Sequence, residues 1–213
     1  MADLKLTYQL PAGFKLMGVY RYQNQQSSSL GLNGLGSYYT RNSINSFSSA
    51  SGSSLTRGIP LGAIRDLSED RLSVHQLRSQ VDYNRKFGKF SIDGIAGFEI
   101  REAKTVGSQN RNYGVNEGSL GSSGVNYNSF YTHPLTGSLG IIPYMNEERG
   151  TNNRYVSLYA NSSFGFKDRY YLTASLRRDA SNLFGVSTNN KWNPLWSLGG
   201  AWLLSSEEWM KTE

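Results

Sequence analysis

The residue types on which enzyme chemistry usually depends are sparse in this chain of 213 residues. It has no cysteine, which excludes thiol catalysis, thiolate-bound metals and a disulfide scaffold. His75 and His133 have no carboxylate or serine partner at a recognisable spacing. The glutamate pairs at 147–148 and 207–208 are adjacent, so a strand would point their carboxylates to opposite faces. The acidic run at 66–70 lacks EF-hand spacing. We therefore predict no catalytic residue, no metal, no cofactor and no enzyme activity.

Charged side chains at alternate positions form a more promising group. If their segments are strands, these side chains share one face of a sheet and line a solvated passage. For any single one of them, the simpler interpretation is that it only keeps a wet surface solvated. The candidate lumen-lining residues are Arg78, Asp82, Asp93, Glu99, Arg101, Arg177 and Asp179.

Aromatic residues in two glycine- and serine-rich stretches are the candidates for recognition. An aromatic face suits the CH groups of a sugar ring, and the same rings would also suit a peptide. The alternatives are that they pack the loops together or contact a partner that covers them. The candidates for ligand or lid contact are Tyr38, Tyr39, Tyr127, Phe130, Tyr131 and Tyr144.

The elements that must position these residues are strands. Seven segments alternate apolar and polar residues with a period of two, and they lack the three- and four-residue repeats of helices. The predicted strands cover residues 4–10, 14–23, 75–84, 90–101, 155–166, 170–179 and 192–204. At 176–185, Arg177 and Asp179 share a face and could pair across neighbouring strands, which indicates a structural bracket for the following loop.

The connections between these strands alternate between short and long. Turns at 11–13, 85–89 and 167–169 are tight, whereas the links at 24–74, 102–154 and 180–191 are longer. Outer-membrane barrels have this arrangement, with short periplasmic turns and long extracellular loops, and strands of about ten residues can cross a bilayer. We therefore predict an all-β fold: a partial antiparallel transmembrane β-barrel wall. A soluble carbohydrate-binding β-sandwich and a passive porin-like barrel are the alternatives.

Composition supports a barrel over other classes. Aromatics make up 13% of the chain, and those near strand ends suit the interfacial girdles of a barrel. The net charge of +6 comes from scattered lysines and arginines, so nucleic-acid binding is not predicted. No apolar run is long enough for a membrane helix. The predicted girdle residues are Tyr20, Tyr22, Tyr83, Phe87, Phe90, Phe164, Phe166, Tyr170, Tyr171 and Trp192.

Several stretches resemble one family, the SusC/RagA-type TonB-dependent outer-membrane transporters of Bacteroidetes. They are HQLRSQVDYNRKFGKFSIDGIAGFEIRE at 75–102, RYYLTASLRRDASNLFGV at 169–186, KWNPLWSLGGAW at 191–202 and SSEEWM at 205–210. The segments RNSINSF at 41–47 and GIPLGAIRD at 58–66 look like the first long loop of the family.

The resemblance implies a location in the bacterial outer membrane, in contact with its lipid, and active import of oligosaccharides or peptides. It also implies two partners, a SusD-like surface lipoprotein that acts as a lid and the TonB complex that supplies energy. No signal peptide, plug or TonB box is recognised in the sequence, and seven strands are too few to close a membrane barrel. We therefore expect residues 1–213 to be one segment of a single barrel domain.

Overall fold

The computed structural model describes residues 1–51, 53–182 and 193–210. These residues form two compact units. Unit 1 comprises Met1–Gln25, Leu72–Thr105 and Thr151–Glu213, and unit 2 comprises Gln26–Arg71 and Val106–Gly150.

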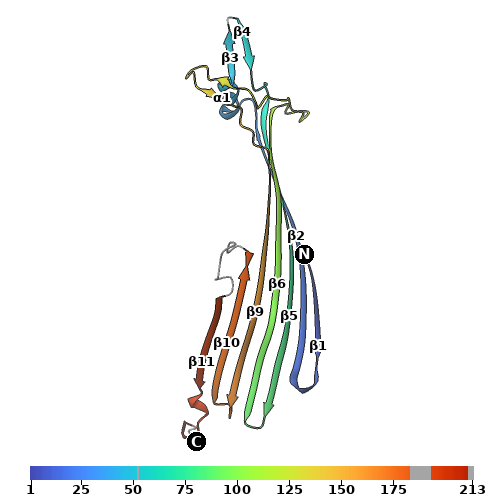
Figure 1. Ribbon diagram of the computed structural model, residues 1–213, viewed down its shortest axis with the longest axis vertical. Helices are drawn as coiled ribbons and strands as arrows, with labels where there is room; N and C mark the ends of the chain where they lie inside the picture. Colours follow the sequence, from blue (N-terminus) through green and yellow to red (C-terminus); the bar gives the residue numbers. More distant parts are fainter. Residues whose placement is uncertain (52, 183–192, 211–213) are drawn as a thin grey trace. The chain divides into compact units, whose positions relative to one another are not determined.

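The chain forms a seven-stranded meander (Figure 1). Each strand of this sheet is hydrogen-bonded to the sheet strand that comes next along the chain. The prediction of a seven-stranded antiparallel meander is confirmed. In sheet order, the strands are β1 (Ala2–Gln9), β2 (Phe14–Asn33), β5 (Ala63–Phe87), β6 (Phe90–Val115), β9 (Glu147–Phe166), β10 (Tyr170–Ser181) and β11 (Asn193–Trp202).

Three tight turns lie at the same end of the sheet of unit 1 (Figure 1). The first is a single 3-10 turn, Pro11–Gly13, in which Ala12 has a φ of 64°. The second turns at Gly88, with a φ of 56°, and the third at Lys167 and Asp168, both with a φ of 54°. The three connections have four, two and three residues, and positive φ in such short turns matches the right-handed twist of the flanking strands, so these turns suit hairpins.

Strand register places the predicted apolar residues on one face of unit 1. Leu172 on β10 pairs with Phe164 on β9, and Leu176 pairs with Trp196 on β11. The apolar side chains on this face remain open: Leu176 is 53% exposed and Trp196 is 75% exposed. Burial of such side chains is the main favourable term in folding, so a face like this requires an apolar environment.

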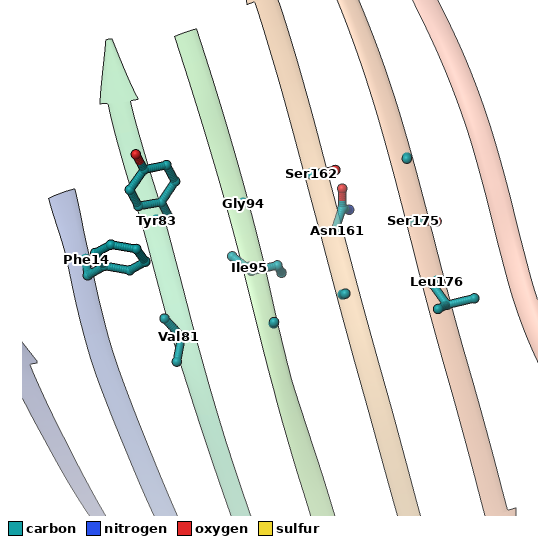
Figure 2. Close-up of a pocket in the computed structure, with 12 residues that line it drawn as sticks. Phe14, Val81, Tyr83, Gly94, Ile95, Asn161, Ser162, Ser175 and Leu176 are labelled. Atoms are coloured by element: carbon teal, nitrogen blue, oxygen red, sulfur yellow. The ribbon is translucent and has the colours of Figure 1, made fainter. Parts of the chain in front are cut away.

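Figure 2 shows part of this apolar face, where a groove of about 410 Å³ crosses the sheet. Phe14 on β2 and Tyr83 on β5 stand together at one side, with ring centroids 4.4 Å apart, and Leu176 on β10 borders the other. Small residues such as Gly94 and Ser162 lie between them. The described residues of unit 1 supply no second layer over this face, which argues against the β-sandwich alternative.

A row of aromatic rings crosses the apolar face at the end with the tight turns. Phe90 contacts Phe166 with ring centroids 4.9 Å apart, Phe166 stacks on Tyr170 at 6.3 Å, and Tyr170 stacks on Trp202 at 6.0 Å. We call these four residues the aromatic belt. Three of them were predicted girdle residues, whereas predicted Trp192 lies outside the described residues.

The links predicted at 24–74 and 102–154 are long in the structure as well, but they are shorter than predicted and cover residues 34–62 and 116–146. Strands β2, β5, β6 and β9 extend far beyond the predicted segments, through residues that do not alternate regularly between apolar and polar. The remaining segments form a helix and two short hairpins, and the link 180–191 falls largely outside the described residues. These elements are α1 (Tyr38–Ser46), β3 (Ser48–Ser51), β4 (Ser54–Arg57), β7 (Tyr131–Thr132) and β8 (Leu139–Gly140).

Unit 2 has its own hydrophobic core. Helix α1 begins after Ser37, whose hydroxyl accepts a hydrogen bond from the backbone N–H of Thr40 at 3.2 Å, a regular N-cap. The helix contributes Ile44, which is 3% exposed. The fully buried core residues are Ile44, Ile59, Ile64, Tyr113 and Ile142. Within the described part of the chain, no helix has both the length and the apolar character needed to cross a membrane.

Candidate functional site

Four of the predicted lumen-lining residues meet in one polar pocket of unit 1. The pocket has a volume of about 470 Å³ and is lined by β6, β9 and β10. Glu99 and Arg101 come from β6, and Arg177 and Asp179 come from β10. Register explains this, because Arg177 pairs with Tyr159 and Asp179 with Ser157 on the β9 strand that separates them from β6. We call these four residues and Tyr155 the zwitterionic pocket.

The ion pair in this pocket differs from the predicted one. Arg177 and Asp179 bond to each other along β10, with Nε and Oδ2 2.8 Å apart, rather than across neighbouring strands. Residues two apart in a strand point to the same side, and a long guanidinium side chain can lie back along its own strand. The Arg177 and Asp179 charges are therefore already matched within one strand.

Glu99 and Arg101 interact with neutral side chains rather than with opposite charges. Glu99 accepts a hydrogen bond of 2.9 Å from the side-chain amide of Gln76. The Arg101 guanidinium lies over the ring of Tyr155, with its carbon 5.8 Å from the ring centroid. Among the described residues it forms no ion pair with a carboxylate. Arg101 is thus the cation of this pocket that is most available to an external anion.

A second network on the same face joins β2, β5 and β9. The Arg78 Nε donates to the Tyr159 hydroxyl at 2.8 Å, and its Nη2 donates to the Gln80 Oε1 at 2.9 Å. Gln80 in turn bonds Asp82, which pairs with Lys15 at 3.0 Å. Predicted Arg78 and Asp82 are therefore both held by protein partners.

Asp93 is the predicted residue that joins neither network. It accepts a hydrogen bond from the Asn84 side chain on the neighbouring strand. Sequence reasoning missed Gln76, Gln80 and Tyr159, which are neutral. Gln76 and Gln80 alternate along β5 with the predicted Arg78 and Asp82, so they face the same side of the sheet, and this alternation could have found them.

The predicted aromatic residues of unit 2 divide into packed and exposed ones. Tyr127 and Tyr131 pack against the hydrophobic core, and Tyr39 lies beneath the guanidinium of Arg111 at 5.8 Å. The exposed residues are Tyr38, Phe130 and Tyr144, with 78%, 68% and 64% of their surface accessible. Tyr127 and Tyr131 thus pack against the core, whereas Tyr39 contacts Arg111 and remains 43% exposed.

One shallow pocket in unit 2 combines aromatic and amide groups. It has a volume of about 630 Å³ and is lined by Val125, Asn126, Tyr127, Asn128 and Tyr144. The Tyr127 and Tyr144 rings meet edge to face with centroids 5.0 Å apart. Burial, followed by the neighbouring Tyr144, raises the pKa of Tyr127, so its phenol stays neutral.

The two histidines have structural partners. The Nδ1 of His75 is 2.8 Å from the Tyr20 hydroxyl, and the Nδ1 of His133 accepts from the backbone N–H groups of Leu135 and Thr136 at 3.3 Å. Over the residues that the structure describes, no group of three or more metal-ligating side chains occurs.

Glu207 has more partners than the sequence indicated. This buried carboxylate accepts hydrogen bonds from the Tyr170 hydroxyl at 2.7 Å and the Trp202 Nε1 at 3.0 Å, and it pairs with Arg169 at 2.8 Å. Tyr170 and Trp202 are members of the aromatic belt. Glu207 therefore holds the polar ends of two belt rings and ties the segment after β11 to the β9–β10 turn.

Comparison with known proteins places these features in context. No family model matches the chain. The TonB-dependent receptor P39 of Formosa agariphila is 27% identical over 135 residues, which are 62% of this chain and 11% of that protein. The chain thus spans about a ninth of the length of this curated relative.

Two solved structures of a transporter have a fold similar to that of this chain. The RagAB peptide transporter matches with a TM-score of 0.70 and 16% identity over 99% of this chain and 20% of the other. The RagAB peptide importer in its open-open state matches with a TM-score of 0.58 and 18% identity over 93% of this chain and 18% of the other.

The proteins that the chain resembles are a TonB-dependent receptor and a transporter rather than enzymes, and TonB-dependent receptors are outer-membrane proteins, which agrees with the predicted location. The predicted resemblance is confirmed: the chain is similar in sequence to a TonB-dependent receptor, and its fold matches part of the RagAB transporter.

Proposed function

We propose that residues 1–213 supply wall, lumen lining and outer loops to a TonB-energised importer. The observation that carries this proposal is the two-sided sheet of unit 1. One face exposes large apolar side chains such as Leu172 and Trp196, and the other gathers the zwitterionic pocket and the Arg78 network. A sheet of this kind separates hydrocarbon from water, as a barrel wall must.

We propose a peptide as the cargo. The zwitterionic pocket presents Glu99 and Asp179 together with Arg101 and Arg177. Peptides carry both an ammonium and a carboxylate group, so a pocket with both signs of charge can bind each end by charge-assisted hydrogen bonds. The fold match to the RagAB peptide transporter gives independent support.

An oligosaccharide is the alternative cargo, and the pocket of unit 2 favours it. Tyr127 and Tyr144 offer ring faces, and Asn126 and Asn128 offer amides that can both donate and accept. Sugars are commonly held by this combination of aromatic stacking and amide hydrogen bonds. The two cargo classes therefore depend on different units of the chain.

Two partners belong to this proposal. A SusD-like lipoprotein lid would cover the outer loops, and the exposed Tyr38 and Phe130 of unit 2 are candidate contacts for it. Aromatic residues are enriched where protein interfaces bury most of their energy. The TonB complex would supply the energy, which distinguishes this function from a passive porin.

Binding measurements on the protein expressed from its complete gene test the cargo. Arg101→Gln should weaken binding of a short peptide about tenfold, the magnitude of one charge-assisted hydrogen bond, and should leave oligosaccharide binding unchanged. Lys104→Gln, an exposed cation on the same strand, is the matched control. If instead Tyr144→Ala weakens oligosaccharide binding and Arg101→Gln has no effect on peptides, the glycan alternative holds.

Uptake in cells tests the transport mechanism. Import of the bound cargo should stop when TonB is deleted, because an active importer needs that energy. Equal uptake with and without TonB would establish the passive porin-like alternative.

A further inference from the structure

Two hairpin turns of unit 1 are joined at the end of the sheet that carries the aromatic belt. The Lys86 Nζ lies 2.6 Å from the Asp168 carboxylate, and the backbone N–H of Lys167 donates to the Lys89 carbonyl at 2.7 Å. We call residues 85–89 and 167–169 the turn rim. Its two turns form one continuous surface.

The turn rim carries more positive charge than its neighbours neutralise. Lys86 is paired with Asp168, and Arg169 is paired with Glu207 and lies 3.9 Å from Glu208. The other three cations have no carboxylate partner within the described parts of the chain. They are Arg85, Lys89 and Lys167.

Two of these three cations lie against aromatic rings at the strand ends. The Arg85 guanidinium carbon is 4.6 Å from the centroid of Phe87, and the Lys167 ammonium is 5.4 Å from the centroid of Phe166. Phe166 belongs to the aromatic belt. Arg85 lies two residues beyond Tyr83 on β5, so it faces the same apolar side of the sheet as Val81 and Tyr83. A long basic side chain at such a place covers apolar surface with its stem and keeps its charge at the polar boundary.

We propose that the turn rim is a docking site for the phosphate headgroups of anionic phospholipids. Three unneutralised cations meet the phosphates, and the adjoining belt rings meet the acyl chains, so one surface serves both parts of a lipid. Interfacial aromatic rings prefer the headgroup level, and an anionic membrane surface attracts basic side chains. Free phosphate would use the cations alone and would leave the belt without a role.

Tryptophan quenching tests this docking site. The protein, expressed from its complete gene and purified in a neutral detergent, is titrated with brominated phosphatidylglycerol or brominated phosphatidylcholine. The reporter is Trp202 of the belt, whose ring stacks on Tyr170 beside the third turn with centroids 6.0 Å apart. Each cation near an anionic lipid surface raises the binding affinity about fivefold. Phosphatidylglycerol should therefore bind at least about tenfold more tightly than phosphatidylcholine.

Three variants give the proposal its controls. The triple variant Arg85→Gln, Lys89→Gln, Lys167→Gln should lose the preference for phosphatidylglycerol. The triple variant Arg41→Gln, Arg57→Gln, Lys104→Gln removes the same charge from exposed sites elsewhere and should keep it. The charge-conserving exchange Arg85→Lys, Lys89→Arg, Lys167→Arg should also keep it, and it decides the question if the first variant does not fold.

The proposal is overturned by any of three results. The wild-type protein could bind both lipids equally, or the two glutamine triples could lose the preference to the same extent, which would show only an effect of net charge. Millimolar inorganic phosphate could also abolish phosphatidylglycerol quenching, which would assign the cations to free phosphate. Folding of each variant is checked by the heat-dependent shift in gel mobility that folded barrels show.

Discussion

Gly97 on β6 lies directly beneath the hydroxyl group of Tyr159 on β9. A Cβ atom at Gly97 would come within 2.6 Å of the Tyr159 hydroxyl oxygen and 2.5 Å of the Ser79 carbonyl oxygen. The missing side chain lets Tyr159 cross over β6 and reach Arg78 and Gln80 on β5. The network on the polar face therefore depends on a glycine that carries no chemistry of its own.

Gly97→Ala should displace the Tyr159 hydroxyl and destabilise the sheet by about 1–3 kcal/mol, the usual cost of overpacking. The carbonyl beneath cannot move without disturbing the strand, so Tyr159 must give way. Urea unfolding followed by gel mobility measures the loss. Gly18→Ala is the control, because a Cβ there meets nothing within 4 Å. Equal losses for both variants would contradict the crossing role.

Arg111→Ala should open unit 2 locally at a cost of about 2 kcal/mol, because a charge-assisted bidentate hydrogen bond is lost. The Arg111 guanidinium binds both carboxylate oxygens of Asp66 at 2.6 and 2.7 Å, and its side chain is only 13% exposed. Amide hydrogen exchange in unit 2 measures the change as faster exchange.

Arg149→Ala is the comparison for this prediction. Arg149 pairs with Asp70 at 2.8 Å in the same unit, but its side chain is 46% exposed. Exposed pairs contribute at most about 1 kcal/mol, so exchange should change little. A larger effect from Arg149→Ala than from Arg111→Ala would show that burial does not set the strength of these pairs.

Sequence reasoning succeeded where one side of a strand is apolar. At Leu172, Leu176 and their neighbours, alternation predicted both the strand and the face, and it assigned Glu99, Arg101 and Arg177 to the opposite, polar face. Partners within that face could not be predicted, because they depend on register between strands. The Arg177–Asp179 bond along one strand shows this limit.

The structure of unit 2 was out of reach for a different reason. Its core residues, such as Ile44, Ile59 and Ile142, come singly from distant segments that are rich in glycine, serine and asparagine. No local period marks them, and only the folded chain brings them together. The N-cap at Ser37 is a local signal for α1 that the strand interpretation passed over.

Ile142→Ala should destabilise unit 2 by about 2–5 kcal/mol, the cost of truncating a buried aliphatic side chain. Ile142 is 1% exposed, whereas its neighbour Ile141 is 46% exposed. Ile141→Ala therefore makes the same chemical change beside it and should cost far less. Protease cleavage within unit 2 compares the two variants, and equal cleavage rates would contradict a packed core in this unit.

Lowering the pH should release the segment after β11, because its attachment depends on an ionised Glu207. Three groups lower the pKa of Glu207 from its ordinary value of 4.5. The hydrogen bond from Tyr170 contributes most, followed by the hydrogen bond from Trp202 and then by the positive charge of Arg169. A carboxylate whose pKa is lowered by folding stabilises the folded state fully above its unfolded pKa, and this contribution is lost as the pH falls through the folded value. Fluorescence of Trp202 and Trp209 should therefore stay constant above pH 4.5 and change in more acidic solution.

Glu207→Gln should remove this transition, whereas Glu208→Gln should keep it, since the Glu208 side chain is 89% exposed and lies 3.9 Å from Arg169. If the two variants titrate alike, the attachment does not depend on Glu207, and the belt rings must be held by packing alone.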